Sequence, residues 1–186
     1  MKKLLLLILI ASAITSYAQE IKDFSLTNVK DGKSVSLSNY SSASGIVVVF
    51  TSHECPYDNY YKDRLKDLVN AYSGKIQFLF INSNQETQES AEQMAIHYSD
   101  LGVPYLADKD QTAMETFGAR KSPEVFLVSK VSGKFTVVYS GAIDDNPQVA
   151  KDVKQTFLKD ALNKVLAREK IEPVSQRAVG CSIRRK

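Results

Sequence analysis

Cys55 is the residue of this chain best placed to do chemistry. It follows the run Val47-Val-Val-Phe-Thr-Ser-His-Glu54 and precedes Pro56, where an apolar strand gives way to a helix. A thiol at a helix N-terminus faces unpaired backbone N–H groups and the positive end of the helix dipole, which favour the nucleophilic thiolate. The alternative is a buried, inert cysteine. The polar residues at this junction favour the reactive thiol.

His53 and Glu54 precede Cys55 directly and act on its thiol in opposite directions. A protonated His53 would stabilise the thiolate or carry its proton, although a solvent-exposed loop histidine is an equal alternative. Glu54 would raise the pKa of the thiol by charge repulsion. The His, Cys and Asp residues of this region do not have the spacing of metal ligands, so neither a metal nor another cofactor is predicted.

Cys181 is the second cysteine and lies in a polar C-terminal tail, where a thiol has little packing purpose. One interpretation is a resolving thiol that attacks oxidised Cys55 and closes a disulfide. A static disulfide, or a tail cysteine that never reaches Cys55, is the other. Closure over this separation requires a docked tail, because ordering a disordered one costs several kcal/mol.

The N-terminus predicts export. Lys2 and Lys3 precede an apolar run over 4–10 and small residues that end at Ala18, which is the pattern of a secretory signal peptide over residues 1–18. The run is too short to span a bilayer. We expect a mature chain that begins at Gln19, has no membrane segment, and resides in the bacterial periplasm or outside the cell.

Length and charge indicate one domain and exclude a nucleic-acid partner. The chain has 186 residues. After removal of the predicted signal peptide, the length suits one domain over 19–172 followed by an irregular tail over 173–186. Without Lys2 and Lys3, 22 of the 24 basic residues face 21 acidic ones. A mature chain so close to neutral is not expected to bind nucleic acid.

The hydrophobic pattern predicts an α/β fold. A β-hairpin is expected over 23–37 around Asp31-Gly32, and apolar runs predict strands at 46–50, 76–81, 124–128 and 135–139. Helical spacing predicts helices over 56–74, 88–101, 111–117 and 149–168. This order of elements implies a mixed central β-sheet with helices on both faces.

Four motifs together resemble the peroxiredoxin-like redoxins of the alkyl hydroperoxide reductase/thiol-specific antioxidant superfamily. They are Phe50-Thr-Ser-His-Glu-Cys-Pro-Tyr57, Ile81-Asn-Ser-Asn84, Gly141-Ala-Ile-Asp-Asp-Asn-Pro147 and Val179-Gly-Cys-Ser-Ile183. The resemblance implies the thioredoxin fold. It also implies that Pro123, before the last strand pair, follows a cis peptide bond and exposes backbone groups beside Cys55 that align a substrate disulfide.

Two departures limit what the resemblance implies. Many relatives have a Cys-x-x-Cys pair whose first position is Ser52 here, so no local cysteine partner exists. Ser52 matches the Thr or Ser that precedes the reactive cysteine of peroxiredoxins by three residues, but Val48 replaces their proline. Pro123 stands near the place of their arginine, and Arg120 is the nearest substitute.

These residues predict a thiol–disulfide oxidoreductase that acts through Cys55, with Cys181, Ser52, Pro123 and His53 as its other site residues. Its partners would be protein or small-molecule thiols and disulfides, and an external thiol reductant. One alternative is a thiol peroxidase that reduces hydroperoxides, with Ser52 and an arginine as hydrogen-bond donors. Another is a non-catalytic binding module with a static Cys55–Cys181 disulfide.

Overall fold

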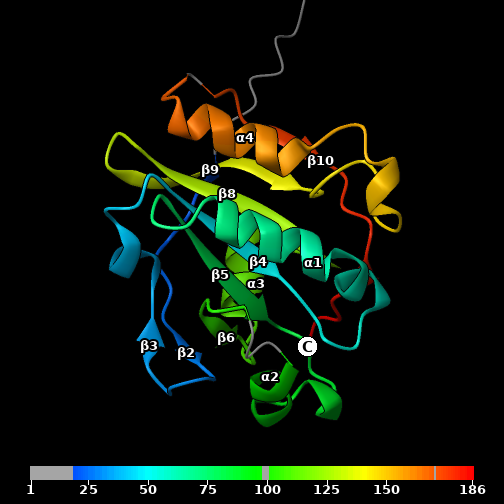
Figure 1. Ribbon diagram of the computed structural model, residues 1–186. Coiled ribbons are helices and arrows are strands. Elements are labelled where there is room, and N and C mark those ends of the chain that lie inside the picture. The colour runs from blue at the N-terminus through cyan, green and yellow to red at the C-terminus, as the bar shows by residue number, and fades with distance from the viewer. Residues whose placement is uncertain (1–18, 98–100, 170) are drawn as a thin grey trace, which may run out of the picture.

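A mixed β-sheet forms the centre of the computed structural model, which describes residues 19–97, 101–169 and 171–186 (Figure 1). The strand order is β1-β9-β8-β4-β5-β6-β2-β3, and β10 also pairs with β9. Neighbours among β4, β5 and β6 are parallel, whereas β8 and β9 are antiparallel. The strands are β1 (Gln19–Glu20), β2 (Leu26–Asn28), β3 (Ser34–Val35), β4 (Gly45–Phe50), β5 (Ile76–Asn82), β6 (Tyr105–Ala107), β8 (Glu124–Val131), β9 (Lys134–Gly141) and β10 (Val174–Gln176).

Helices cover both faces of this sheet, and the predicted α/β arrangement with its N-terminal hairpin β2–β3 is confirmed. The helices are α1 (Pro56–Ala71), α2 (Ala91–His97), α3 (Thr112–Phe117) and α4 (Phe157–Leu166), with 3-10 turns η1 (Leu37–Tyr40), η2 (Thr87–Glu89) and η3 (Ala150–Asp152). α1 and α4 lie on one face and α3 on the other (Figure 1). Across the described residues, no helix has the length and apolar character needed to cross a membrane.

The apolar run of β4 is explained by burial on both faces. Val47 and Val49 pack on the side of α1 and α4, whereas Val48 and Phe50 pack on the side of α3. All four side chains are completely buried. Because successive side chains of a strand alternate between faces, a strand covered on both sides is apolar throughout. Cys55, at the start of α1, comes five residues after this buried strand and is positioned by it.

The last predicted helix is wrong at its N-terminal half. The structure has the short turn η3 and then α4, instead of one helix over 149–168. The Asp145 carboxylate accepts a hydrogen bond from the Lys154 N–H at 2.9 Å, and Val153 is extended. This side-chain bond holds the backbone out of the helix. The predicted helix over 88–101 starts later than expected, because the turn η2 precedes α2, which begins at Ala91. Residues 98–100 lie outside the described residues, as does the predicted signal peptide 1–18.

The tail predicted to be irregular is instead ordered against the sheet, and that prediction is wrong. β10 runs parallel to β9, and β11 (Cys181–Ser182) pairs antiparallel with β7 (Lys121–Ser122). Gly141 permits the first contact, because a Cβ there would lie 1.6 Å from the carbonyl oxygen of Gln176. The tail docks mainly through backbone pairing, so its polar side chains give no sign of it.

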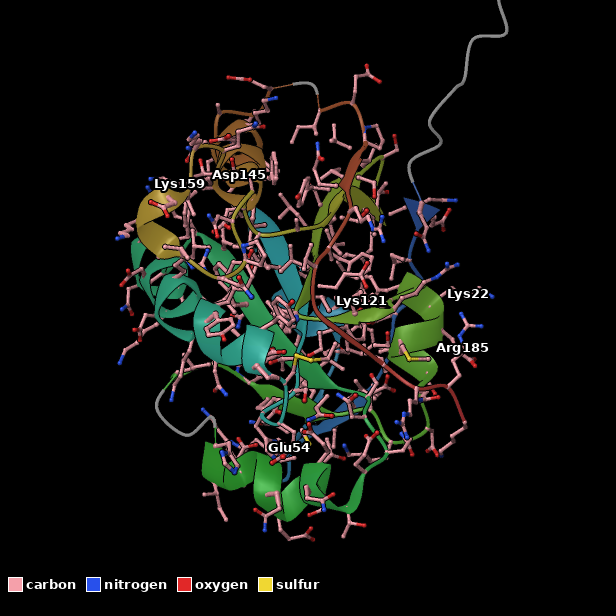
Figure 2. The ribbon with its side chains drawn as sticks, turned by 90° about the vertical axis from the view of Figure 1, so that its right-hand side faces the viewer. Lys22, Glu54, Lys121, Asp145, Lys159 and Arg185 are labelled. Atoms are coloured by element: carbon pink, nitrogen blue, oxygen red, sulfur yellow. A yellow bond between two sulfur atoms is a disulfide. The ribbon has the colours of Figure 1, made fainter. Side chains whose placement is uncertain are left out.

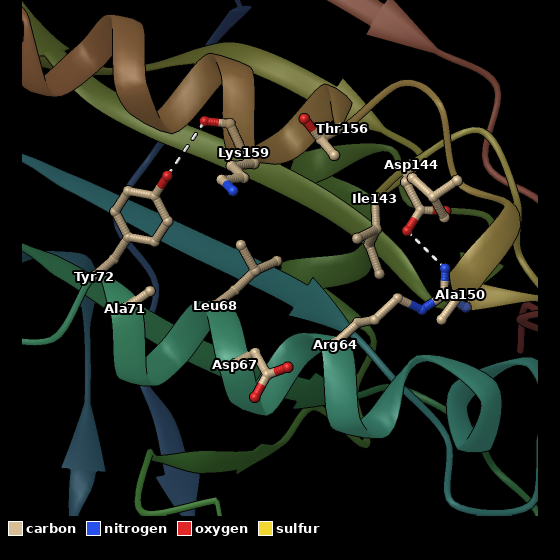
Figure 3. Close-up of a pocket in the computed structure, with 11 residues that line it drawn as sticks. Arg64, Asp67, Leu68, Ala71, Tyr72, Ile143, Asp144, Ala150, Thr156 and Lys159 are labelled. Carbon is tan, nitrogen blue, oxygen red and sulfur yellow. Dashed lines mark hydrogen bonds and ion pairs between the residues drawn. The ribbon is translucent and has the colours of Figure 1, made fainter.

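Arg64 ties α1 to the loop between β9 and η3 at the edge of a cavity of about 460 Å³ (Figure 3). Its guanidinium donates to Asp144 at 2.6 Å and to the carbonyl of Asn146 at 2.7 Å, and Tyr61 also donates to Asp144 at 3.0 Å. Arg64 and Asp144, which both line this cavity, therefore partner each other.

The Arg64→Lys protein should be less stable than the wild type by about 1–3 kcal/mol, because an ammonium group cannot reproduce the planar fork of bonds. Urea unfolding at neutral pH measures this free energy. Lys66→Ala, at an exposed position of the same helix, is the control and should change stability by less than about 0.5 kcal/mol. A similar small effect for Arg64→Lys would show that the fork is not needed.

Candidate active site

Cys55 and Cys181 form a disulfide in this structure, with their Cα atoms 6.0 Å apart. Cys55 is the N-cap residue of α1 and is only 2% exposed, whereas Cys181 on β11 is half-buried. Figure 2 shows the disulfide inside the molecule between the labelled Lys121 and Glu54. The tail therefore reaches Cys55, as the interpretation of Cys181 as its partner requires, and Cys181 is the more exposed residue of the pair.

The Ser122–Pro123 peptide bond lies beside the disulfide and is cis, as predicted. The carbonyl oxygen of Ser122 is 3.2 Å from the Cys55 sulfur. Cys181 stands opposite Ser122 in the β7–β11 pair. The backbone edge that was expected to be open to a substrate is therefore occupied by the tail of the chain itself.

Ser52 is buried below Cys55 and bonded to a carboxylate. Its hydroxyl accepts the N–H of Cys55 at 3.1 Å and donates to Glu89. Glu89 is 2% exposed and also accepts a hydrogen bond from Asn82 at 2.6 Å. The hydroxyl hydrogen of Ser52 is thus committed to Glu89 and points away from any reactant at the sulfur. Sequence reasoning missed Glu89, which is distant from Cys55 along the chain.

His53 is buried, so the alternative of a solvent-exposed loop histidine is wrong. Its Nε2 lies 2.5 Å from the carbonyl oxygen of Gln88, and its Nδ1 lies 3.0 Å from a Glu89 carboxylate oxygen. The ring stacks on His97 with centroids 4.2 Å apart. These contacts direct the His53 ring toward η2 and α2 and link the Cys55 loop to those elements.

Asp58 is a second buried carboxyl group at the site, and sequence reasoning missed it too. It lies in the first turn of α1, three residues after Cys55, and accepts hydrogen bonds from Thr51 at 2.5 Å and Ser122 at 2.6 Å. Burial raises the pKa of Asp58 to about 7, and the charge of Glu89 adds to this, against the hydrogen bonds that lower it. Its position three residues from Cys55 on a helix start was the available signal.

Comparison with known proteins places this arrangement in a family. Residues 17–134 match the model of the AhpC/TSA family. The chain belongs to the AhpC/TSA family. A comparison with curated proteins finds no match.

Solved structures similar to this AhpC/TSA chain establish its thioredoxin-like fold. An uncharacterized conserved protein from Geobacillus kaustophilus is 28% identical, with a TM-score of 0.81 over 93% of this chain and 94% of that one. The exposed lipoprotein thioredoxin of Streptococcus pneumoniae is 20% identical, with a TM-score of 0.59 over 77% and 99%. Peroxidoxin BcpB from Mycobacterium tuberculosis is 17% identical, with a TM-score of 0.56 over 82% and 97%.

A cavity of about 280 Å³ opens this AhpC/TSA site to solvent beside the disulfide. Both cysteines, Ser52, Glu89 and Arg184 are among the residues that line it. Arg120, the predicted substitute for the peroxiredoxin arginine, is exposed and is not among them. The arginine that faces the site is therefore Arg184 of the tail, which is 84% exposed and 4.0 Å from Glu86.

Two buried carboxyl groups lie close to Cys55. Glu89 is linked to the Cys55 N–H by two hydrogen bonds through Ser52, and Asp58 accepts a hydrogen bond from Ser122, whose carbonyl oxygen lies 3.2 Å from the Cys55 sulfur. A negative charge on either group opposes the helix dipole, which favours the thiolate. Within the described ranges, no group of three or more His, Cys, Asp or Glu side chains is arranged to hold a metal ion.

Proposed function

We propose that this AhpC/TSA protein is a thiol–disulfide oxidoreductase whose redox centre is the Cys55–Cys181 pair. The observation that carries the proposal is the disulfide between the N-cap residue of α1 and a half-buried cysteine on β11, beside the backbone of Ser122. Thiol–disulfide exchange needs an accessible sulfur and a leaving thiolate, and the two cysteines supply one each. Pro123 fixes the backbone at this place.

The oxidised pair accepts electrons in two exchange steps. A partner thiolate attacks the Cys181 sulfur, a mixed disulfide forms, and Cys55 leaves as a thiolate at the start of α1. A second partner thiol then attacks the mixed disulfide, which releases the Cys181 thiol and an oxidised partner. Two electrons have passed from two partner thiols to the pair.

A second sequence, in which the two cysteines exchange roles, reduces a partner disulfide. The Cys55 thiolate attacks a partner sulfur, forms a mixed disulfide and releases one partner thiolate. The Cys181 thiolate then attacks the Cys55 sulfur, which restores the Cys55–Cys181 disulfide and releases the second partner thiol. An external thiol reductant is needed to reduce the pair again, so thiols and disulfides are the proposed partners.

Thiol peroxidase activity is the alternative, and the surroundings of Cys55 disfavour it. Peroxide reduction needs donors that stabilise the charge growing on the leaving oxygen. Ser52 gives its hydrogen to Glu89, Arg120 lies outside the cavity beside the disulfide, and Arg184, which lines that cavity, is 84% exposed and lies 4.0 Å from Glu86. Disulfide exchange does not require those donors.

A direct comparison of substrates tests this choice. The reduced protein should reduce a protein disulfide such as that of insulin with repeated turnover when a dithiol reductant is present. Hydrogen peroxide and an alkyl hydroperoxide should be consumed no faster than by a free thiol of pKa about 8.5. Fast, saturable hydroperoxide consumption without disulfide reduction would replace this proposal by the peroxidase.

We also propose that residues 1–18 are a signal peptide and that the protein acts outside the cytoplasm, where its disulfide can form. Expression of the full chain in a bacterium should yield a protein whose N-terminus is Gln19, in the periplasm or the medium. Intact-mass measurement of each fraction checks this. A full-length chain found only in the cytoplasm would contradict the proposal.

A further inference from the structure

The tail approaches β7 so closely that only glycine fits before Cys181. A Cβ atom on Gly180 would lie 2.2 Å from the carbonyl oxygen of Ser122 and 3.1 Å from the nitrogen of Pro123. Both are backbone atoms of a buried segment, so neither can move aside as a flexible side chain would. An alanine at this position would force the tail away from the edge.

The residues after Cys181 hold the tail in register. The N–H of Ile183 donates to the carbonyl of Arg120 at 3.0 Å, and the Ile183 side chain is buried. The Gln111 side chain makes two hydrogen bonds to the backbone after Cys181. It donates to the carbonyl of Arg184 at 2.6 Å and accepts from the N–H of Lys186 at 2.8 Å. The tail is therefore bound as an extended peptide whose cysteine meets Cys55.

We infer that the Lys121–Ser122 edge, beside which a substrate disulfide is expected to align, selects extended segments that have glycine directly before their cysteine. The tail, with Gly180 and Cys181, is the occupant in this structure. For partner proteins, this glycine selection rests on the proposed function. A partner protein whose reactive cysteine follows a non-glycine residue meets the Ser122 carbonyl and reacts slowly.

The reaction at this edge is a thiol–disulfide exchange of the kind described under the proposed function. The Cys55 thiolate attacks one sulfur of a peptide disulfide, a Cys55–peptide disulfide forms, and the other peptide leaves as a thiolate. The backbone contacts of the edge align the attacked sulfur. Their loss through a Cβ clash slows the step without changing the sulfur chemistry.

The first experiment uses the tail as its own probe. Equilibration of the full chain with oxidised and reduced glutathione gives the equilibrium constant of the Cys55–Cys181 disulfide. For Gly180→Ala we expect this constant to fall by at least about tenfold, because overpacking against backbone destabilises the docked tail. Val179→Ala, at the adjacent and 45% exposed position, is the matched control and should leave the constant within about twofold.

The second experiment presents the edge with partners. The full chain carrying Gly180→Ala and Cys181→Ser frees the edge and keeps Cys55. Its reaction with the symmetric disulfides of Val-Gly-Cys-Ser-Ile and Val-Ala-Cys-Ser-Ile is followed by the mass of the mixed disulfide, and each rate is divided by that of the same peptide with glutathione. The glycine peptide should react at least about tenfold faster.

The outcomes separate this inference from the proposed function. Equal normalised rates for the two peptides overturn the inference and leave the oxidoreductase intact. Absence of any mixed disulfide rejects the oxidoreductase. In that case the glutathione equilibrium alone tests glycine selection at the edge. An equilibrium constant of the Cys55–Cys181 disulfide that is unchanged in Gly180→Ala overturns the inference.

Discussion

We expect the Cys55→Ser protein to lose disulfide-exchange activity by at least about a thousandfold, because a serine hydroxyl does not ionise near neutral pH and cannot replace the thiolate. Both reaction sequences need Cys55, as leaving group in one and as nucleophile in the other. Turnover with insulin and a dithiol reductant measures the loss. Thermal unfolding of the wild type under reducing conditions provides the reference for an intact fold.

Cys181→Ser is the matched variant, because it removes the same disulfide and leaves Cys55. This protein should form a stable mixed disulfide with its substrate, visible by intact mass, and should turn over slowly for lack of a resolving thiol. Equal activity of the Cys55→Ser protein and the wild type would refute the assignment of Cys55. Unchanged turnover of Cys181→Ser would instead assign resolution to an external thiol.

The Asp58→Asn protein should be more stable than the wild type at pH 8, by about 2–4 kcal/mol. Burial raises the pKa of Asp58 from 3.8 to about 7. Between these values the unfolded chain has lost the proton that the folded chain still holds, so the wild type loses stability as pH rises from about 4 to 7. Asparagine does not ionise, and its carboxamide can bond the hydroxyls of Thr51 and Ser122 in place of the carboxylic acid.

Urea unfolding of both oxidised proteins at pH 4 and pH 8 checks this pH dependence. The advantage of Asp58→Asn should shrink to less than about 1 kcal/mol at pH 4, where the carboxyl group is neutral in the folded state. Asp63→Asn, at an exposed position of the same helix, is the control without such a trend. If Asp58→Asn is less stable than the wild type by the same amount at both pH values, burial does not raise the pKa of Asp58.

Sequence periodicity was sufficient for the central layers of the fold. The continuous apolar run of β4 and the helical spacing after Pro56 placed Cys55 at the junction where the structure has it. Glycine ended α3 as expected, with Gly118 in the left-handed region at φ 69°. These elements are predictable because burial on a face imposes its own period on the residues that form it.

The tail and the buried carboxyl groups were beyond such reasoning for physical reasons. The tail docks by backbone pairing and close approach at Gly141 and Gly180, which leave no hydrophobic period in the sequence. Glu89 reaches Ser52 only because β5 and η2 carry it there through the fold. The cis bond at Pro123 was implied by the resemblance to redoxins and not by the residue pattern.

The reduction potential of the Cys55–Cys181 pair tests the central claim most directly. Equilibration of the full chain in dithiol redox buffers, with thiols trapped and counted by mass, gives this potential. An exchanging pair should lie between about −270 and −120 mV, in the range of thiol–disulfide oxidoreductases. A value below about −300 mV is that of a structural disulfide. It would contradict the oxidoreductase and support a binding module with a static disulfide.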